Sequence, residues 1–282
     1  MRDAPVPAGV NERLLAELAQ PQARPFRLAD NPRLVRVGSV VAVLLAWQAV
    51  GSRVNPLFFS PPTAIARGAV EMLISGEFLR HAWGSLWAFA VGLAGAMVLG
   101  IFLGLLMGRY RLAEYLLDPY VYALDATPRV ALIPLLLLWF GLGAPAKIAV
   151  VFLSGLFPVL MNTFSGVRTV GTDLVDIGRA YGASERQTFA KVIVPAALPF
   201  IMTGIRLGVG RALIGIVTAE MFTAVSGLGG LLIRLSSALN APSTAKFFVP
   251  VIFLALLGVA LSAAAAALQR RLAPWKESER AL

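Results

Sequence analysis

About six long apolar segments, separated by shorter polar stretches, limit the folds open to this chain. A helix needs about 20 mostly apolar residues to cross a bilayer, and it satisfies its own backbone hydrogen bonds there. Of the 282 residues, 58% are apolar and 14% are charged, which excludes a soluble globular enzyme, a disordered chain and a fibrous one. The sequence therefore predicts an all-α polytopic membrane protein. The expected transmembrane helices are Leu34–Val50, Ser85–Met107, Tyr120–Leu142, Lys147–Phe164, Ala196–Val225 and Phe247–Leu268.

The distribution of basic residues predicts how the chain is oriented. With the N-terminus inside, sixteen of the 25 Lys and Arg residues fall in cytoplasmic segments, and lysine and arginine favour that side. Both termini are therefore expected in the cytoplasm. Residues 1–33 form a Pro-rich tail, and residues 34–282 form the membrane domain. Within the tail, Glu12–Gln20 is either a short amphipathic helix on the membrane surface or a disordered stretch.

Few residues in this chain are suited to metal or covalent chemistry. The chain has no Cys and one His, so the sequence predicts no disulfide, no thiolate nucleophile and no metal site built on several imidazoles. A membrane-embedded enzyme is disfavoured for the same reason. The net charge of +10 is attributed to basic loops beside the membrane, and no nucleic-acid partner is expected.

The longest predicted inner loop, about residues 168–195, carries the most local information. Asp173 is placed to cap a short helix, with Asp176 in the first turn, where a carboxylate suits the positive helix end. Gly182 follows at the position where a left-handed residue ends a helix. Ser184 and Gln187 form the capping-box pattern of a second helix. The loop is therefore predicted to be two short helices joined by a tight glycine turn.

The end of that loop and its small residues add two expectations. Pro195 is expected to limit the second helix, because proline lacks the N–H that a helix interior needs. Small residues allow a partner surface to approach closely, which suits a unit that docks into another protein. A plain connecting loop is the alternative, whereas a DNA-reading motif is disfavoured because spans flank the loop. The small residues are Gly178, Ala180, Gly182 and Ala183.

The same loop resembles the cytoplasmic EAA signature of bacterial ABC importer permeases. That signature reads Glu-Ala-Ala, three residues, Gly, nine residues, Ile-x-Leu-Pro. This chain has Asp176-Ile177-Gly178, three residues, Gly182, nine residues and Val192–Pro195, so the spacing matches throughout. Asp replaces Glu, which keeps the acidic charge, and Ile-Gly replaces Ala-Ala.

Further segments extend the resemblance over roughly residues 55 to 275. They are similar to the branch of these permeases that carries sulfonates, taurine, nitrate and some vitamin precursors. The matching segments are Phe59–Pro62, His81–Leu86, Ala131–Pro134, Trp139–Gly141, Pro195–Pro199, Ala219–Glu220 and Gly227–Gly229.

The resemblance implies a non-enzymatic transport subunit of the type I permease fold in a bacterial inner membrane. It implies a second permease copy, two cytoplasmic ATPase subunits that bind ATP and Mg, and a periplasmic or lipid-anchored binding protein. The chain itself has no Gly-x-x-x-x-Gly-Lys-Ser/Thr phosphate loop and needs no cofactor. The residues expected to couple it to the ATPase are Asp176, Gly178, Ala180, Tyr181, Gly182, Ala183 and Ser184.

The expected substrate is a small anion such as a sulfonate, taurine or nitrate. A vitamin precursor or another heterocycle is the alternative for the same machinery. A stand-alone secondary transporter is less favoured, because inverted repeats with broken helices in both halves are not found.

Four charged residues inside the predicted spans are candidates for the translocation pathway. A charge at the centre of a span costs about 2.5–3.5 kcal/mol on insertion scales, so such residues face a cavity or a partner. Asp125 and Arg129 are four residues apart and are able to pair. Arg211 is able to attract an anion or to pair with another helix. Glu220 lies nine residues further, about 13.5 Å along a helix, too far for a direct bond to Arg211.

Two runs of glycine at four-residue spacing predict close helix packing. The runs are Gly100, Gly104 and Gly108, and Gly204, Gly208 and Ala212. Packing within the chain is favoured over a seam between two copies.

Overall fold

The computed structural model describes residues 32–170, 172–223, 225–238 and 240–273. The predicted tail and its amphipathic stretch therefore lie almost entirely outside the described residues. The chain divides into two compact units, Met1–Val50 and Gly51–Leu282. The described part of the first unit is residues 32–50, which belong to helix α2 (Pro32–Gly51). The apolar stretch Leu34–Gly51 of this helix is long enough to cross a membrane. This helix confirms the first predicted span.

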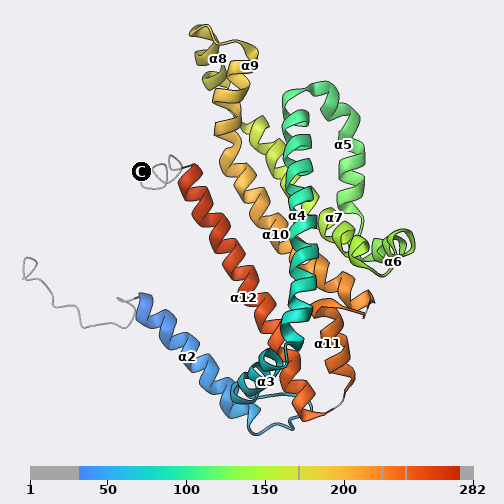
Figure 1. Cartoon of the computed structure of the whole chain (residues 1–282). Coiled ribbons are helices and arrows are strands. Elements are labelled where there is room, and N and C mark those ends of the chain that lie inside the picture. The colour runs from blue at the N-terminus through green and yellow to red at the C-terminus, as the bar shows by residue number, and fades with distance from the viewer. Residues whose placement is uncertain (1–31, 171, 224, 239, 274–282) are drawn as a thin grey trace, which may run out of the picture. The chain divides into compact units, whose positions relative to one another are not determined.

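Every regular element among the described residues of the second unit is a helix (Figure 1). Helices α4, α7, α10 and α12 are each long and apolar enough to span a bilayer, in agreement with the sequence. Helices α3 and α11 were not predicted. The elements are α3 (Pro62–Ile74), α4 (Glu77–Arg109), α5 (Arg111–Ala126), α6 (Arg129–Phe140), α7 (Ala144–Thr169), α8 (Thr172–Ala180), α9 (Glu185–Thr188), the π-helix η2 (Phe189–Ile193), α10 (Val194–Thr223), α11 (Gly227–Ser237) and α12 (Ala241–Leu272).

The third predicted span is not a continuous helix. The prediction of one span at Tyr120–Leu142 is wrong in its bounds, because α5 begins at Arg111 and meets α6 at an angle of 98°. The break lies at Thr127 and Pro128, both with extended backbone. Proline disfavours helical geometry in the residue before it and has no N–H to continue the helix. The two helices together are apolar enough to form either one broken span or a re-entrant loop.

Helix α7 lies at the centre of the unit, packed between α4 and α10 (Figure 1). Glycines allow both contacts. A Cβ on Gly104 of α4 would lie 2.6 Å from the Cβ of Thr163, and one on Gly204 of α10 would lie 2.8 Å from the Cβ of Asn162. No side chain larger than hydrogen fits at such distances without movement. The glycine runs therefore pack within the chain, as predicted.

Helix α9 continues into the membrane instead of ending at the predicted proline. The prediction that Pro195 limits this helix is wrong, because Glu185–Thr223 is one helical segment of 39 residues. The π-helix η2 comes directly before Pro195, and the Val194 N–H reaches back five residues to the Phe189 carbonyl. A π turn widens the helix and shifts its hydrogen bonds, which accommodates a proline ring in the next turn.

Candidate functional site

The turn between α8 and α9 has the geometry that the sequence predicts. We call residues 172–188 the α8–α9 hairpin. Gly182 has a left-handed φ of +76°, and the Ala183 N–H donates to the Gly178 carbonyl at 3.0 Å. This bond closes a Schellman-type helix end. Ser184 and Gln187 form a complete capping box, at 3.3 Å and 2.8 Å. The side chain of Asp173, predicted as a cap, lies outside the described residues, and α8 already begins at Thr172.

The hairpin exposes an apolar stripe that sequence reasoning only partly found. Leu174, Ile177 and Tyr181 are exposed at 50%, 55% and 89%, and their spacing of three and four residues places them on one helix face. Gly178 instead faces Thr188, since a Cβ there would lie 3.7 Å from its hydroxyl. The stripe, and not this glycine, is therefore available to a partner. The predicted coupling residues Asp176, Ala180, Gly182 and Ser184 are also exposed, and Ala183 is half-buried.

Ion pairs tie this end of the unit to the helices below it. Arg109, the last residue of α4, contacts Glu185 at 2.6 Å. Arg168 near the end of α7 contacts Glu114 of α5 at 3.2 Å. Both pairs are partly exposed, so each contributes little on its own. The first pair holds the start of α9 against α4, and the second holds the end of α7 against α5.

Three of the four predicted pathway residues line one pocket of about 290 Å³. Asp125 comes from the end of α5, Arg129 from the start of α6, and Arg211 from the middle of α10. The bend between α5 and α6 brings the first two to the pocket wall. The structure thus places Asp125, Arg129 and Arg211 together. Smaller side chains complete the wall, among them Ser154 and Thr218.

The two arginines of this pocket differ in what they contact. Arg129 forms the predicted ion pair with Asp125, and its guanidinium carbon lies 5.4 Å from the ring centre of Phe157. Its Nε is buried and has no hydrogen-bond partner. Arg211 makes neither an ion pair nor a hydrogen bond with any described residue. The pocket therefore holds two guanidinium groups against one carboxylate.

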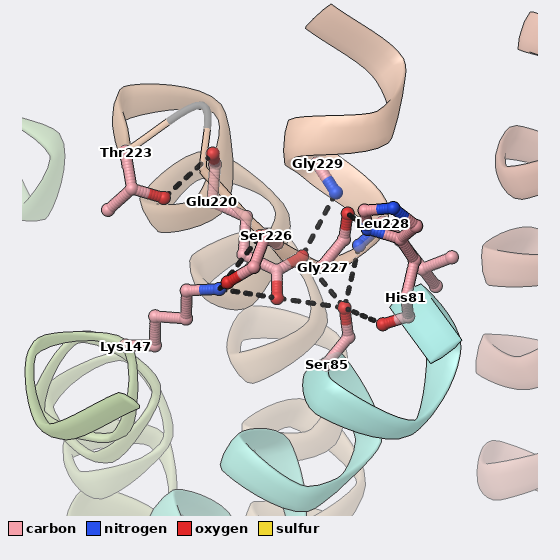
Figure 2. A network of polar contacts seen from close by, with 9 residues as sticks. All are labelled: His81, Ser85, Lys147, Glu220, Thr223, Ser226, Gly227, Leu228 and Gly229. Atoms are coloured by element: carbon pink, nitrogen blue, oxygen red, sulfur yellow. Dashed lines mark hydrogen bonds and ion pairs between the residues drawn. The ribbon is translucent and has the colours of Figure 1, made fainter. Parts of the chain in front are cut away.

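Glu220, the fourth predicted pathway residue, lies in a separate network whose central carboxylate is fully buried (Figure 2). It is 0% exposed, and its carboxylate lies 3.4 Å from Nζ of Lys147, which is 4% exposed. The Ser85 hydroxyl donates to the same carboxylate at 2.8 Å, and the Gly229 N–H donates at 2.9 Å. Glu220 does not line the pocket. Its carboxylate holds the positive N-terminal end of α11, which a negative charge stabilises.

The other members of this network complete its hydrogen bonds. Lys147 also donates to the backbone carbonyl and the hydroxyl of Ser226, both at 2.8 Å. The Leu228 N–H donates to the Ser85 hydroxyl at 2.8 Å, and Nδ1 of His81 lies 3.0 Å from the Gly227 carbonyl. Sequence reasoning missed this role of Lys147, because its buried partner Glu220 lies 73 residues away in the chain. His81 thus joins α4 to the backbone at the start of α11.

Comparison with known proteins agrees with this architecture. Residues 96–275 match the family described as binding-protein-dependent transport system inner membrane component. A Bacillus subtilis protein named as an aliphatic sulfonates transport permease, SsuC, is 35% identical, and the match covers 84% of this chain and 86% of that protein. The taurine transport system permease protein TauC of Escherichia coli is 31% identical over 85% and 88% of the two chains.

Two more relatives extend the comparison to another substrate name and to a solved fold. The formylaminopyrimidine transport permease protein ThiX of Halalkalibacterium halodurans is 31% identical over 84% of this chain and 94% of that protein. A chain of the MetNI methionine ABC transporter, in an inward-facing conformation, has a TM-score of 0.56 at 20% identity and covers 67% of this chain and 93% of its own. That likeness shows the shared helical fold. The chain belongs to the binding-protein-dependent transport system inner membrane components, the membrane-spanning permease subunits of ABC importers.

Proposed function

We propose that the chain forms half of a homodimeric pathway, driven by two cytoplasmic ATPase subunits that bind ATP and Mg and supplied by a binding protein. The carrying observation is the α8–α9 hairpin, which presents an apolar stripe and stands at the opposite end of the second unit from α3 and α11 (Figure 1). Exposed apolar side chains in register on a short, capped helix are typical of a docking surface. The lysines and arginines around the hairpin favour its location on the cytoplasmic side of the membrane.

The continuous helix from α9 to α10 supports a mechanical route from ATPase to pathway. The segment Glu185–Thr223 has 39 residues, about 58 Å at 1.5 Å per residue. Its first turn belongs to the hairpin, and Arg211 in its middle lines the pocket. A displacement of the hairpin therefore moves the pocket wall. ATPase closure would bias the permease between two conformations through this helix.

The substrate class that we propose is a small organic or inorganic anion. Two of the relatives are named for aliphatic sulfonates and taurine, and the pocket carries more positive than negative charge. The relative named for formylaminopyrimidine supports a second candidate, a heterocyclic vitamin precursor moved by the same machinery. The cationic pocket favours the anion. The ligand that co-purifies with the cognate binding protein, identified by mass spectrometry, separates the two.

A charge placed on the hairpin stripe tests the docking surface. We expect Ile177→Asp to reduce the amount of ATPase that co-purifies with the permease by at least about tenfold, because it places a carboxylate in an apolar contact. Ile74→Asp is the matched control, since Ile74 is 82% exposed at the end of α3. Equal ATPase retention in both variants would refute the assignment of the hairpin.

The glycine turn provides a second test of coupling. Gly182→Ala introduces a Cβ into a left-handed residue with open space around it, and Gly76→Ala does the same at φ +70° between α3 and α4. Each change strains the backbone by roughly 1 kcal/mol. We expect only Gly182→Ala to lower substrate-stimulated ATP hydrolysis in the assembled importer. A matching loss in the Gly76 variant would point to general destabilisation.

A further inference from the structure

Arg211 is a charge within a predicted membrane span that the described residues leave unpaired. It shares one face of α10 with Ile214, Gly215 and Thr218, which all line the 290 Å³ pocket. A guanidinium in the membrane region is stable only beside water, a counter-charge or an anionic ligand. The positions three, four and seven residues after Arg211 point the same way on a helix. This face of α10 is therefore one wall of the compartment that holds the Arg211 charge.

Helix α6 adds positive potential to the same compartment. Its N-terminal residues, Pro128, Arg129 and Val130, line the pocket, and its first turn has no side-chain cap. Unpaired N–H groups at a helix start attract anions. The buried Nε of Arg129 is a further donor without an acceptor. The uncapped start of α6 and the Arg129 residue that begins it thus lie at one wall of the pocket.

The charge balance indicates what kind of ligand fits. Asp125 neutralises one guanidinium, and Arg211 leaves a net charge of about +1. A volume of about 290 Å³ holds a ligand of a few heavy atoms together with several waters, each of which occupies about 30 Å³. Arginine recognises planar or tetrahedral oxyanions through paired N–H donors. The complement is one small monoanion.

We propose that the pocket formed by Arg211, Arg129 and the start of α6 is an anion-binding station on the translocation pathway, and that it takes a sulfonate-type monoanion. The proposal rests on the proposed function and deepens it, since it names the residues that meet the anion inside the membrane. Asp125 is the opposing charge that keeps the station weak enough to release its ligand. All the groups that form the station belong to described residues of this chain.

Charge-selective labelling tests the station directly, because the natural chain has no cysteine. Thr218→Cys introduces one thiol into the pocket of the full chain, within the assembled importer in lipid nanodiscs. The probes are 2-sulfonatoethyl methanethiosulfonate, an anion, and its trimethylammonium-ethyl analogue, a cation. Labelling of this chain is followed by intact mass. The labelling rate of the anionic reagent is divided by that of the cationic reagent. This ratio is then normalised by the same ratio measured with glutathione in solution.

We expect the anionic reagent to react faster, with a normalised ratio well above one. Adding Arg211→Gln should lower the ratio about fourfold, the effect of removing one charge about 10 Å away along the helix in a water-filled pocket. Asp125→Asn should raise it. Millimolar ethanesulfonate should slow the anionic reagent in the Thr218→Cys protein and not in the variant that also carries Arg211→Gln.

Arg206→Gln is the matched control for charge loss on the same helix. Arg206 contacts Gln269 of α12 at 2.5 Å and does not line the pocket, so its removal should leave the ratio unchanged. Equal effects of the two arginine variants would overturn the proposal. So would an unreactive thiol both at residue 218 and at a second reporter, Val130→Cys, because the pocket would then be closed to water.

The remaining outcome concerns a second copy of the chain. If Arg211 instead pairs with a carboxylate of the second copy, Arg211→Gln leaves the ratio unchanged and weakens the permease dimer on size exclusion, and the station is refuted. The proposed function is refuted by a different result, namely equal ATPase retention in the Ile177→Asp and Ile74→Asp variants. An importer that keeps its ATPase and shows no charge preference at residue 218 overturns only the station.

Discussion

Two groups of charged residues in the same membrane domain have opposite surroundings. Lys147 and Glu220 are almost completely buried, and every nearby donor finds an acceptor. Arg129 and Arg211 line an open pocket, and each keeps unused donor capacity. A buried charge without a partner is strongly unfavourable, so the first group must be complete for the fold to exist. The second group is free to bind something else. The comparison separates charges that complete their contacts within the fold from the charges that we propose serve transport.

The first group also positions an element that lies beside it. Glu220 and Ser85 bind the first N–H groups of α11 (Figure 2). Gly227, with a φ of +89°, and Gly229 lie against the Glu220 side chain so closely that neither tolerates a Cβ. Helix α11 is therefore fixed to α4 and α10. In contrast, the α8–α9 hairpin at the other end of the unit presents its apolar stripe to solvent.

The largest effect should follow from removal of the buried carboxylate. We expect Glu220→Ala to lower the free energy of unfolding by about 3–5 kcal/mol, because it leaves Lys147 buried without a counter-charge. Titration of the purified chain with SDS, followed by circular dichroism, measures the loss. Glu220→Gln keeps an acceptor for Gly229 and should lose less. A loss below that of Arg211→Gln would contradict the distinction between the two groups.

A methyl group at Gly227 should have the next largest effect. An ideal Cβ there would lie 1.8 Å from Oε1 of Glu220, and the backbone is left-handed. We expect Gly227→Ala to cost more than about 2 kcal/mol, because strain and steric overlap add. The same SDS titration compares it with Gly76→Ala, which has a similar φ and open space. Equal losses would show that backbone strain alone is responsible.

The exposed ion pair of the pocket should matter much less. Asp125→Ala removes the partner of Arg129, and the two side chains are 41% and 21% exposed. Partly solvated pairs contribute about 0–1 kcal/mol, so we expect a loss in that range by SDS titration. A loss as large as that of Glu220→Ala would place this pair with the structural charges.

The smallest effect on stability is expected at Arg211. Arg211→Gln breaks no ion pair or hydrogen bond with the described residues, so the free energy of unfolding should change by less than about 0.5 kcal/mol. Uptake of labelled taurine or ethanesulfonate into proteoliposomes that hold the complete importer should fall at the same time. A stable variant with unchanged uptake of every anion that the importer accepts would remove Arg211 from the pathway.

Local sequence patterns predicted much of the fold and one of the two candidate sites. The five continuous spans follow from apolar length, and the α8–α9 hairpin follows from Gly182 and the Ser184 capping box. Each of these depends on residues that are neighbours in the chain. Predictions from local patterns were wrong where the backbone is able to adopt more than one conformation. Pro195 is accommodated by a π turn, which no residue type in the sequence predicts. The angle of the bend at Pro128 likewise does not follow from the composition.

The pocket shows the same limit. The sequence identified Asp125, Arg129, Arg211 and Glu220 as charges in spans, because charged residues are rare in apolar segments. It had no means to divide them into three that meet and one that does not. The sequence likewise did not predict that Leu174 and Ile177 are exposed, since a short amphipathic helix buries its apolar face in most proteins.

Sequence alone determined that this chain spans a membrane, where its five continuous spans run, and where a tight glycine turn stands between two short helices. Only the tertiary structure decided which charges are neighbours. Lys147 meets Glu220 across 73 positions of sequence, and Arg211 meets the start of α6 across more than 80. Helix packing sets those encounters, through glycines that bring α4, α7 and α10 close and a bend that turns α6 toward them. The stability of a charge in the membrane depends on such distant neighbours, so helix packing determines the role of each charged residue.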